Sequence, residues 1–443
     1  MNSTRLLRYA LRANALFSAA TGVAMVASVD TLPHQLDLPA PLLQAVGSLL
    51  VGYGLALGLL SVSRHVASRW AVTATAMDLG WVIGSAALLA FHPVPRAELV
   101  GVTALAVLAV ALLQLAGLRR AGFWAEEGRL AAAADRGRSG SMTHQVDWSF
   151  SGTWPYSPRW FETMDGHMHY VDEGPRSGRP VVLVHGNPTW GYLYRNFIPP
   201  LVAAGFRVIV ADHLGFGRSD KPDAIARYTI ELHARRLEAL LESLDLRDAT
   251  LGVQDWGGPT GLSWATRHSE RVRSLVIMNS FAHRPPKPVS LPLPLRLFRT
   301  PGLGELLVKG LHAFVHLLVF RAGVVHPDRL TAPVRAAYLA PHPTWASRTA
   351  VLAFPRSIPN GPVGPVSDFL EDVHVGLAAF RAKPVFIAWA MKDIGFTPDL
   401  LEELWLGDFP GAEVLRLPDA GHYLQEDAHE LIVPAMIDFL QRT

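Results

Sequence analysis

Hydrophobic residues dominate the first quarter of the chain, in four runs separated by short polar segments. The runs cover residues 13–29, 42–62, 70–91 and 99–118. Each holds about 17–22 residues, which is long enough for a helix to cross a hydrocarbon core about 30 Å thick. We therefore expect residues 1–122 to form a region of four transmembrane helices.

The pattern changes after these runs. Residues 123–145 are rich in Ala, Arg, Gly and Ser with little apolar periodicity, which is typical of a linker. In residues 146–443, short apolar runs alternate with stretches of helical spacing. A hairpin is expected over 160–172, turning at Asp165-Gly166. Further strands are expected at 180–184, 207–211, 249–253, 272–278, 384–389 and 413–417, and helices at 230–244, 259–268 and 428–440. Strands that alternate with helices predict an α/β fold with a mostly parallel, doubly wound sheet.

One long segment interrupts this alternation. Residues 282–372, approximately, contain many prolines and two apolar pieces of helical spacing, 303–320 and 332–339. An insertion after the strand at 272–278 would lie over the carboxyl ends of the strands, where open α/β sheets bind ligands. We interpret the segment as a helical cap.

The net charge and the distribution of basic residues favour association with a membrane over binding of a nucleic acid. The formal net charge is only +2 with dispersed basic residues, so no nucleic-acid partner is expected, and the absence of cysteine excludes disulfides and thiolate metal sites. Arginines cluster before the first run, between the second and third, and after the fourth: Arg5, Arg8, Arg12, Arg64, Arg69, Arg119 and Arg120. Because cytoplasmic loops keep the basic excess, we expect a multi-pass membrane protein whose large C-terminal part is cytoplasmic.

The third apolar run contains Asp78. A carboxylate inside a membrane is costly and can mark a functional site. We prefer the simpler interpretation of a protonated or hydrogen-bonded side chain at a helix interface, and treat the region as an anchor. Neither its further role nor the oligomeric state follows from the sequence.

The main candidate catalytic motif is Gly252-Val253-Gln254-Asp255-Trp256-Gly257-Gly258, which lies between an expected strand and an expected helix. A strand, a sharp turn with small residues and a helix make a nucleophile elbow, in which the central side chain is exposed above the sheet. Here that residue is Asp255. A carboxylate at this position attacks carbon and forms an alkyl ester, which water must then cleave.

A nucleophile of this kind needs a base and a partner for the base. In α/β-hydrolases the order along the chain is nucleophile, acid, histidine. His422 follows the last expected strand, and Asp393 follows the strand before it. An acid after the sixth strand is a known alternative, but residues 279–282 (NSFA) contain no carboxylate. We therefore predict Asp393 as the acid and His422 as the base.

Two further positions predict an anion site. The loop after the strand at 180–184 contains Asn187, and Trp256 follows the nucleophile. These positions supply the backbone N–H groups of an oxyanion hole. Their side chains add two N–H donors, which suit a soft leaving anion better than ester hydrolysis. We predict Asn187 and Trp256 as the halide- or oxyanion-binding residues.

Taken together, residues 185–190, 253–258, 389–393 and 421–427 closely resemble the haloalkane dehalogenases, and the acid position with the Asn/Trp pair resembles that family's third subfamily. Residues 212–222 (DHLGFGRSDKP) fit as well. The resemblance covers about residues 150–443 and implies an α/β-hydrolase fold, hydrolysis of a carbon–halogen bond by the two-step route, and no metal or organic cofactor. It does not extend to residues 1–140.

Other functions remain open. The chain also resembles the β-lactone decarboxylases of bacterial olefin biosynthesis, notably at residues 335–346, and a membrane anchor beside an apolar cap suits a lipophilic substrate. Epoxide hydrolases share the aspartate elbow but usually have two cap tyrosines, whereas this cap has only Tyr338. A non-catalytic membrane sensor or scaffold is the alternative of another class, and it would not require the set Asp255, His422 and Asp393.

Overall fold

The computed structural model describes residues 5–62, 68–91, 96–120 and 146–443. The chain separates into two compact units, Met1–Thr143 and His144–Thr443. The linker predicted at 123–145 lies outside the described residues.

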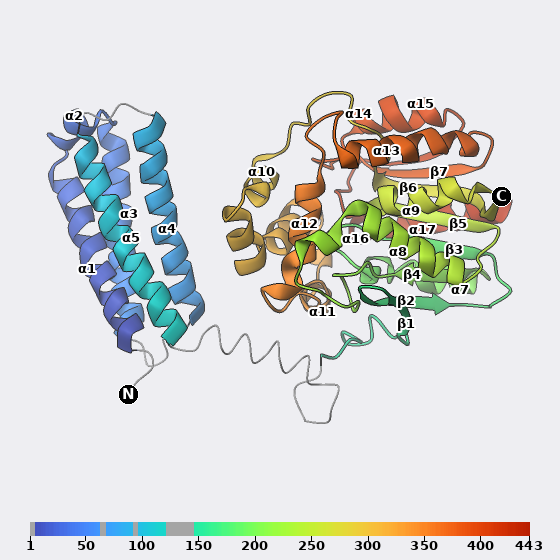
Figure 1. The fold of residues 1–443 in the computed structure, drawn as a ribbon, viewed down its shortest axis with the longest axis horizontal. Helices are drawn as coiled ribbons and strands as arrows, with labels where there is room; N and C mark the ends of the chain where they lie inside the picture. Colours follow the sequence, from blue (N-terminus) through green and yellow to red (C-terminus); the bar gives the residue numbers. More distant parts are fainter. Residues whose placement is uncertain (1–4, 63–67, 92–95, 121–145) are drawn as a thin grey trace. The chain divides into compact units, whose positions relative to one another are not determined.

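The described part of the N-terminal unit contains four long helices and one short one (Figure 1): α1 (Arg5–Ala27), α2 (Leu32–Leu36), α3 (Ala40–Val62), α4 (Ser68–Phe91) and α5 (Ala97–Arg120). Helices α3, α4 and α5 each contain one of the apolar runs, and α1 covers residues 13–27 of the first run. Among the described residues, three helices are long and apolar enough to cross a membrane: Arg5–Ala27, Ala40–Val62 and Ala97–Leu118. Helices α1 and α3 pack closely, because a Cβ added at Gly54 would lie 2.7 Å from the carbonyl oxygen of Ala15.

A buried polar cluster joins the long helices of this unit. Asp78 accepts hydrogen bonds from Asn14 Nδ2 at 2.6 Å and from the Tyr53 hydroxyl at 3.0 Å. Thr75 donates to Gln114 at 2.8 Å nearby. The interpretation of Asp78 as a hydrogen-bonded side chain at a helix interface is confirmed. Buried polar groups of this kind specify which helix faces meet.

The C-terminal unit is built on one eight-stranded sheet with the order β1-β2-β4-β3-β5-β6-β7-β8. Its strands are β1 (Arg159–Thr163), β2 (Gly166–Glu173), β3 (Pro180–Val184), β4 (Arg207–Ala211), β5 (Ala249–Asp255), β6 (Val272–Ser280), β7 (Val385–Ala390) and β8 (Glu413–Leu417). Strands β1 and β2 form the predicted hairpin, β2 pairs antiparallel with β4, and all later pairs are parallel. The predicted fold class is confirmed.

Helices cover both faces of this sheet (Figure 1). Successive residues of β3 point to opposite faces. Val182 and Val184 pack with α8 (Ile230–Ser243) and α9 (Gly257–Arg267), whereas Val181 and Leu183 belong to the core that contains α7 (Ile198–Ala203) and α17 (His429–Arg442). Burial on both faces explains why the central strands read as continuous apolar runs. The remaining elements outside the cap are η1 (Gly191–Tyr194), η2 (Ile225–Tyr228), η3 (Ser269–Arg271), η8 (Leu377–Phe380), α14 (Pro398–Leu400), η9 (Leu401–Trp405), α15 (Leu406–Asp408) and α16 (Leu424–Asp427).

The segment between β6 and β7 is helical, as predicted for the cap. It contains α10 (Leu293–Arg299), η4 (Glu305–Gly310), η5 (Val315–Ala322), η6 (Pro327–Arg329), α11 (Ala332–Leu339), η7 (Ala346–Arg348), α12 (Thr349–Ser357) and α13 (Pro365–Gly376). The cap contacts loops that follow the carboxyl ends of strands. Trp190, after β3, donates to the carbonyl of Ala337 at 2.9 Å, and Asp427, after β8, accepts from the N–H groups of Val325 and His326, each at 2.9 Å.

A buried ion pair also holds the cap to the sheet unit. Both guanidinium Nη atoms of Arg195 donate to the carboxylate of Glu426 at 2.6 Å, and the hydroxyl of the cap residue Tyr338 donates to the same carboxylate. The side chains of Arg195 and Glu426 are 8% and 2% exposed. Removal of one partner would leave the other as an uncompensated buried charge.

We expect Arg195→Met to lower the free energy of unfolding by about 3–5 kcal/mol, measured by denaturant titration of the full chain in detergent. The exposed pair Arg416–Glu402 provides the control, and Arg416→Met should cost no more than about 1 kcal/mol. Equal effects of the two substitutions would contradict a structural role for the buried pair.

Candidate active site

Asp255 lies at the sharp turn between β5 and α9. Its backbone has a φ of +52°, in the left-handed region that non-glycine residues rarely adopt. The turn requires glycine after it, since a Cβ at Gly257 would lie 2.3 Å from the Val184 carbonyl oxygen and a Cβ at Gly258 would lie 2.0 Å from Ser280 Oγ. Ser280 Oγ in turn donates to the Asp255 carbonyl at 2.7 Å. Asp255 therefore lies at a sharp strand–turn–helix junction, the local geometry that the sequence predicts for this motif.

Backbone N–H groups hold the Asp255 carboxylate. The N–H of Asn187 donates to Asp255 Oδ1 at 2.8 Å, and the N–H of Trp256 also donates to the carboxylate. A Cβ at Gly186 would lie 2.1 Å from the same Oδ1, so only glycine fits beside it. Burial raises the pKa of Asp255, while His422 and the two N–H groups oppose that shift by favouring the ionised form.

His422 and Asp393 lie next to this carboxylate. His422 Nε2 is 3.6 Å from Asp255 Oδ2, and His422 Nδ1 is 2.8 Å from Asp393 Oδ2. Burial alone would lower the pKa of His422, but the charges of Asp393 and Asp255 outweigh it and the pKa is raised above 6.5. The structure thus brings together the three predicted residues: Asp255 at the end of β5, Asp393 in the loop after β7 and His422 in the loop after β8.

Asp393 is kept ionised by several donors. Burial favours its neutral form, yet the pKa is lowered because His422 and the N–H groups of Gly395 and Phe396 favour the carboxylate. Those N–H groups donate to Oδ1 at 2.8 and 3.1 Å. The stable negative charge fixes His422 with its Nδ1 proton toward Asp393, which leaves Nε2 facing Asp255.

Two polar side chains at the site were not predicted. Asn279, at the end of β6, donates to Asp393 Oδ2 at 2.9 Å and accepts from the Ala390 N–H at 2.7 Å. Gln254 Nε2 lies 3.2 Å from His422 Nε2. From the sequence, Asn279 lies just after the predicted strand 272–278 and is recognisable only as a position without a carboxylate. The signal for Gln254 is its position next to Asp255 in the motif.

Asn187 and Trp256 are both buried to the same degree, at 5% exposure. The indole of Trp256 packs edge-on against Phe281 at 5.0 Å between ring centroids, and lies 5.3 Å from the cap residue Phe354. The side-chain oxygen of Asn187 is buried without a hydrogen-bond partner. The contacts with Phe281 and Phe354 thus place apolar rings beside the indole of Trp256.

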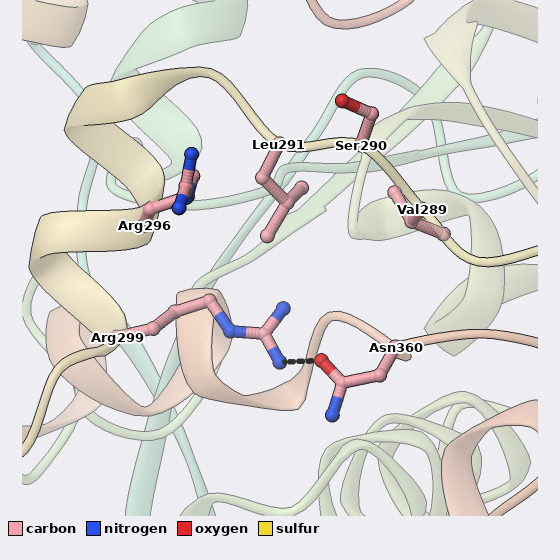
Figure 2. A pocket seen from close by; sticks show the side chains of 6 residues that line it. All are labelled: Val289, Ser290, Leu291, Arg296, Arg299 and Asn360. Atoms are coloured by element: carbon pink, nitrogen blue, oxygen red, sulfur yellow. Dashed lines mark hydrogen bonds between the residues drawn. The ribbon is translucent and has the colours of Figure 1, made fainter.

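A surface pocket of about 430 Å³ lies elsewhere, around α10 (Figure 2). Its lining residues are Val289, Ser290, Leu291, Arg296, Arg299 and Asn360. Arg299 donates to Asn360 at 2.6 Å across it. None of the predicted site residues lines this pocket.

Residues 179–429 match the family model described as alpha/beta hydrolase fold, which is more than half of the chain. The chain belongs to the α/β-hydrolase fold family. Its relatives within that family are haloalkane dehalogenases and β-lactone decarboxylases, as the sequence motifs indicated.

Three relatives illustrate the similarity. The cis-3-alkyl-4-alkyloxetan-2-one decarboxylase of Xanthomonas campestris is 39% identical over 295 residues, covering 65% of this chain and 97% of the relative. Haloalkane dehalogenase 2 of Mycobacterium tuberculosis is 34% identical over 287 residues, covering 64% and 95%. The crystal structure of a putative ancestral haloalkane dehalogenase superposes with a TM-score of 0.58 at 32% identity, covering 64% of this chain and 98% of that structure.

Proposed function

We propose that this protein is a hydrolase that uses Asp255 as nucleophile and cleaves carbon–halogen bonds of lipophilic molecules, as haloalkane dehalogenases do. The observation that carries the proposal is the approach of His422 Nε2 to within 3.6 Å of Asp255 Oδ2, with Asp393 2.8 Å behind the imidazole. A nucleophile, a base and an orienting acid are the set that a covalent two-step hydrolysis needs.

In the first step, an Asp255 oxygen forms a bond to the halogen-bearing carbon, and the halide leaves with the bonding electrons. The side-chain N–H groups of Asn187 and Trp256 would bind that anion. In the second step, His422 takes a proton from water, the resulting hydroxide attacks the ester carbonyl, and the alcohol leaves with a proton returned by His422. The resulting Asp255 carboxylic acid releases its proton to solvent, which regenerates the carboxylate, and neither step uses a metal or an organic cofactor.

A second candidate function is the decarboxylation of a cis-dialkyl β-lactone. It is favoured by the 39% identity to the cis-3-alkyl-4-alkyloxetan-2-one decarboxylase of Xanthomonas campestris, of which 97% is covered. Attack of Asp255 on the saturated, alkyl-bearing ring carbon that is bonded to the ring oxygen would break that carbon–oxygen bond, open the lactone and release a tethered carboxylate. Loss of CO₂ would then form the alkene and expel the Asp255 carboxylate. This route regenerates the enzyme without water.

Substrate assays on the full chain separate the two. A 1-bromoalkane should give bromide and the alcohol in equal amounts, whereas a cis-dialkyl β-lactone should give an alkene and CO₂. Turnover of the lactone alone would replace the dehalogenase proposal with the second candidate. Turnover of neither, by folded protein, would favour a binding-only role.

Epoxide hydrolysis has less support from the cap. Its one tyrosine, Tyr338, donates its hydroxyl to Glu426 and is almost fully buried. A hydroxyl engaged with a buried carboxylate is not free to protonate an epoxide oxygen. An epoxide in the same assay tests this alternative directly.

The pH dependence of turnover tests the role of Asp393. Because water activation needs neutral His422, and because Asp393 raises the pKa of that imidazole, the acidic limb of the kcat profile should lie above pH 6.5. Asp393→Asn should move this limb to lower pH and reduce kcat by up to about 10⁴-fold. Asp419→Asn changes an exposed carboxylate paired with Lys392 and should leave the profile unchanged. A limb that does not move in Asp393→Asn would remove Asp393 from the mechanism.

We propose further that α1, α3, α4 and α5 anchor the protein in a membrane with the hydrolase unit in the cytoplasm. Support comes from three helices of spanning length and from leucines that project outward from them, such as Leu16, Leu49 and Leu105. The arginine distribution sets the orientation.

If substrates enter from the bilayer, deletion of residues 1–140 should reduce kcat/KM for long-chain substrates more than for short ones. Protease protection in sealed vesicles checks the orientation. In sealed inside-out vesicles a cytoplasmic hydrolase unit is accessible to protease, so protection of that unit would contradict the orientation. Equal losses of kcat/KM for long-chain and short-chain substrates would contradict entry from the bilayer.

A further inference from the structure

Two histidines and an aspartate meet at the base of the cap, away from the proposed catalytic residues. His283 comes three residues after β6, where the cap begins, and His374 lies near the end of α13, where the cap ends. Asp408 ends α15 in the sheet unit. The three residues are distant along the chain, yet one potential ligand atom from each lies within 4.8 Å of the others.

The distances within this cluster are close to those of a metal site. His283 Nε2 is 2.9 Å from Asp408 Oδ2, and His374 Nε2 is 3.2 Å from the same oxygen. Zinc binds histidine and carboxylate at about 2.0–2.2 Å in a tetrahedron, which places neighbouring ligand atoms about 3.3 Å apart. The two histidine–aspartate distances lie within a few tenths of an ångström of that separation, and all three ligand atoms lie within 4.8 Å of one another.

The surroundings suit a bound cation with one open position. Trp405 packs edge-on against the His283 ring at 4.9 Å, so one side of the cluster is apolar. His283 is buried, whereas the side chain of His374 is 36% exposed, which leaves room for water as a fourth ligand. The nearest arginine along the chain, Arg284, is paired with Asp368 and Glu371 on α13.

We propose that His283, His374 and Asp408 bind a divalent transition metal ion of the zinc type, which joins both ends of the cap to the sheet unit. Two imidazoles and one carboxylate are ligands that favour zinc over magnesium or calcium. The ion lies outside the proposed reaction, for which no metal is expected. It would stiffen the start of the cap, where Phe281 packs against Trp256 at 5.0 Å.

Cobalt binding to the full chain tests the proposal. The protein is prepared in detergent without a polyhistidine tag, stripped with a chelator and titrated with Co²⁺ alone. We expect one Co²⁺ per chain, with the intense visible absorption of four-coordinate cobalt, and displacement by Zn²⁺. Zn²⁺ should also raise the Tm of the stripped protein, because an ion that binds only the folded state stabilises it.

Variants at the two partly exposed ligands identify the site. His374→Gln and Asp408→Asn should each weaken Co²⁺ binding about 100-fold or more and abolish the Tm increase. The control is His268→Gln, because His268 belongs to the other such cluster in the described part of the chain, with Glu238 and Glu242. Arg267 already neutralises Glu238 there, at 2.7 Å, so this change should have no effect.

Three results would overturn the proposal. One is a parent protein that binds no Co²⁺ at micromolar concentration. Another is a weak six-coordinate cobalt spectrum. The last is equal Co²⁺ affinity in His374→Gln, Asp408→Asn and the parent, which would show that the three side chains form a hydrogen-bonded cluster only.

Discussion

Asp255→Asn should reduce the turnover rate of every electrophilic substrate by about 10⁴-fold or more, while the fold is retained. Under the proposed mechanism no other group forms the covalent bond, and the loss of a nucleophile that acts together with its base removes most of the catalytic advantage. Asparagine is the suitable replacement because it tolerates the positive φ of residue 255 and its oxygen can still accept from the Asn187 N–H. Halide, alcohol, alkene and CO₂ release provide the measurement.

The control for this prediction is a carboxylate outside the site. Asp419→Asn should keep parental activity, since Asp419 is exposed and paired with Lys392. An unchanged Tm in Asp255→Asn would show that the loss is chemical. Substantial activity in a correctly folded Asp255→Asn protein would refute the proposed nucleophile.

His422→Ala should stop haloalkane turnover after one chemical event. The first step does not use the base, so halide should appear as a burst of about one equivalent per protein, and an alkyl ester should remain on Asp255. Steady-state turnover should fall by about 10²–10⁴-fold, the contribution typical of general base catalysis. Intact mass and peptide mapping would detect the ester and place it.

The same variant separates the two candidate reactions in a second way. Decarboxylation of a β-lactone regenerates Asp255 without water, so His422→Ala should retain lactone turnover if that route operates. Gln254 lies 3.2 Å from His422 Nε2, and Gln254→Leu provides a comparison that removes this contact but keeps the base. If the parent protein hydrolyses a bromoalkane but His422→Ala accumulates no alkyl ester with the same substrate, the two-step route is contradicted.

Much of the sheet unit could be predicted from the sequence because its strands are buried on both faces. The predicted strand at 180–184 coincides with β3, and that at 207–211 coincides with β4. Glycine spacing located the elbow, since the close approaches at Gly257 and Gly258 admit no other residue. Strand β5 extends two residues beyond its prediction, because Gln254 and Asp255 are polar but still pair with β6.

The less predictable features depend on contacts between distant segments. Prolines elsewhere in the cap, and π-helical turns in η4 and η5, break its periodicity, so the helical piece predicted over 303–320 forms two separate segments. Asn279 supports Asp393 across 114 positions, and His283 meets Asp408 across 125. A single sequence contains no spacing rule for such pairs, since the fold itself brings them together.

The two oxygens of the Asp255 carboxylate are not equivalent, and turnover in ¹⁸O-labelled water would reveal the difference. Oδ1 is held by the Asn187 N–H and enclosed by Gly186, whereas Oδ2 faces His422. Under the proposed hydrolysis in H₂¹⁸O, the first alcohol released carries ¹⁶O from Oδ2, and ¹⁸O replaces it on the enzyme. If the carboxylate cannot rotate in its cradle, each later turnover exchanges that same position. After many turnovers the elbow peptide should then contain one heavy oxygen and not two.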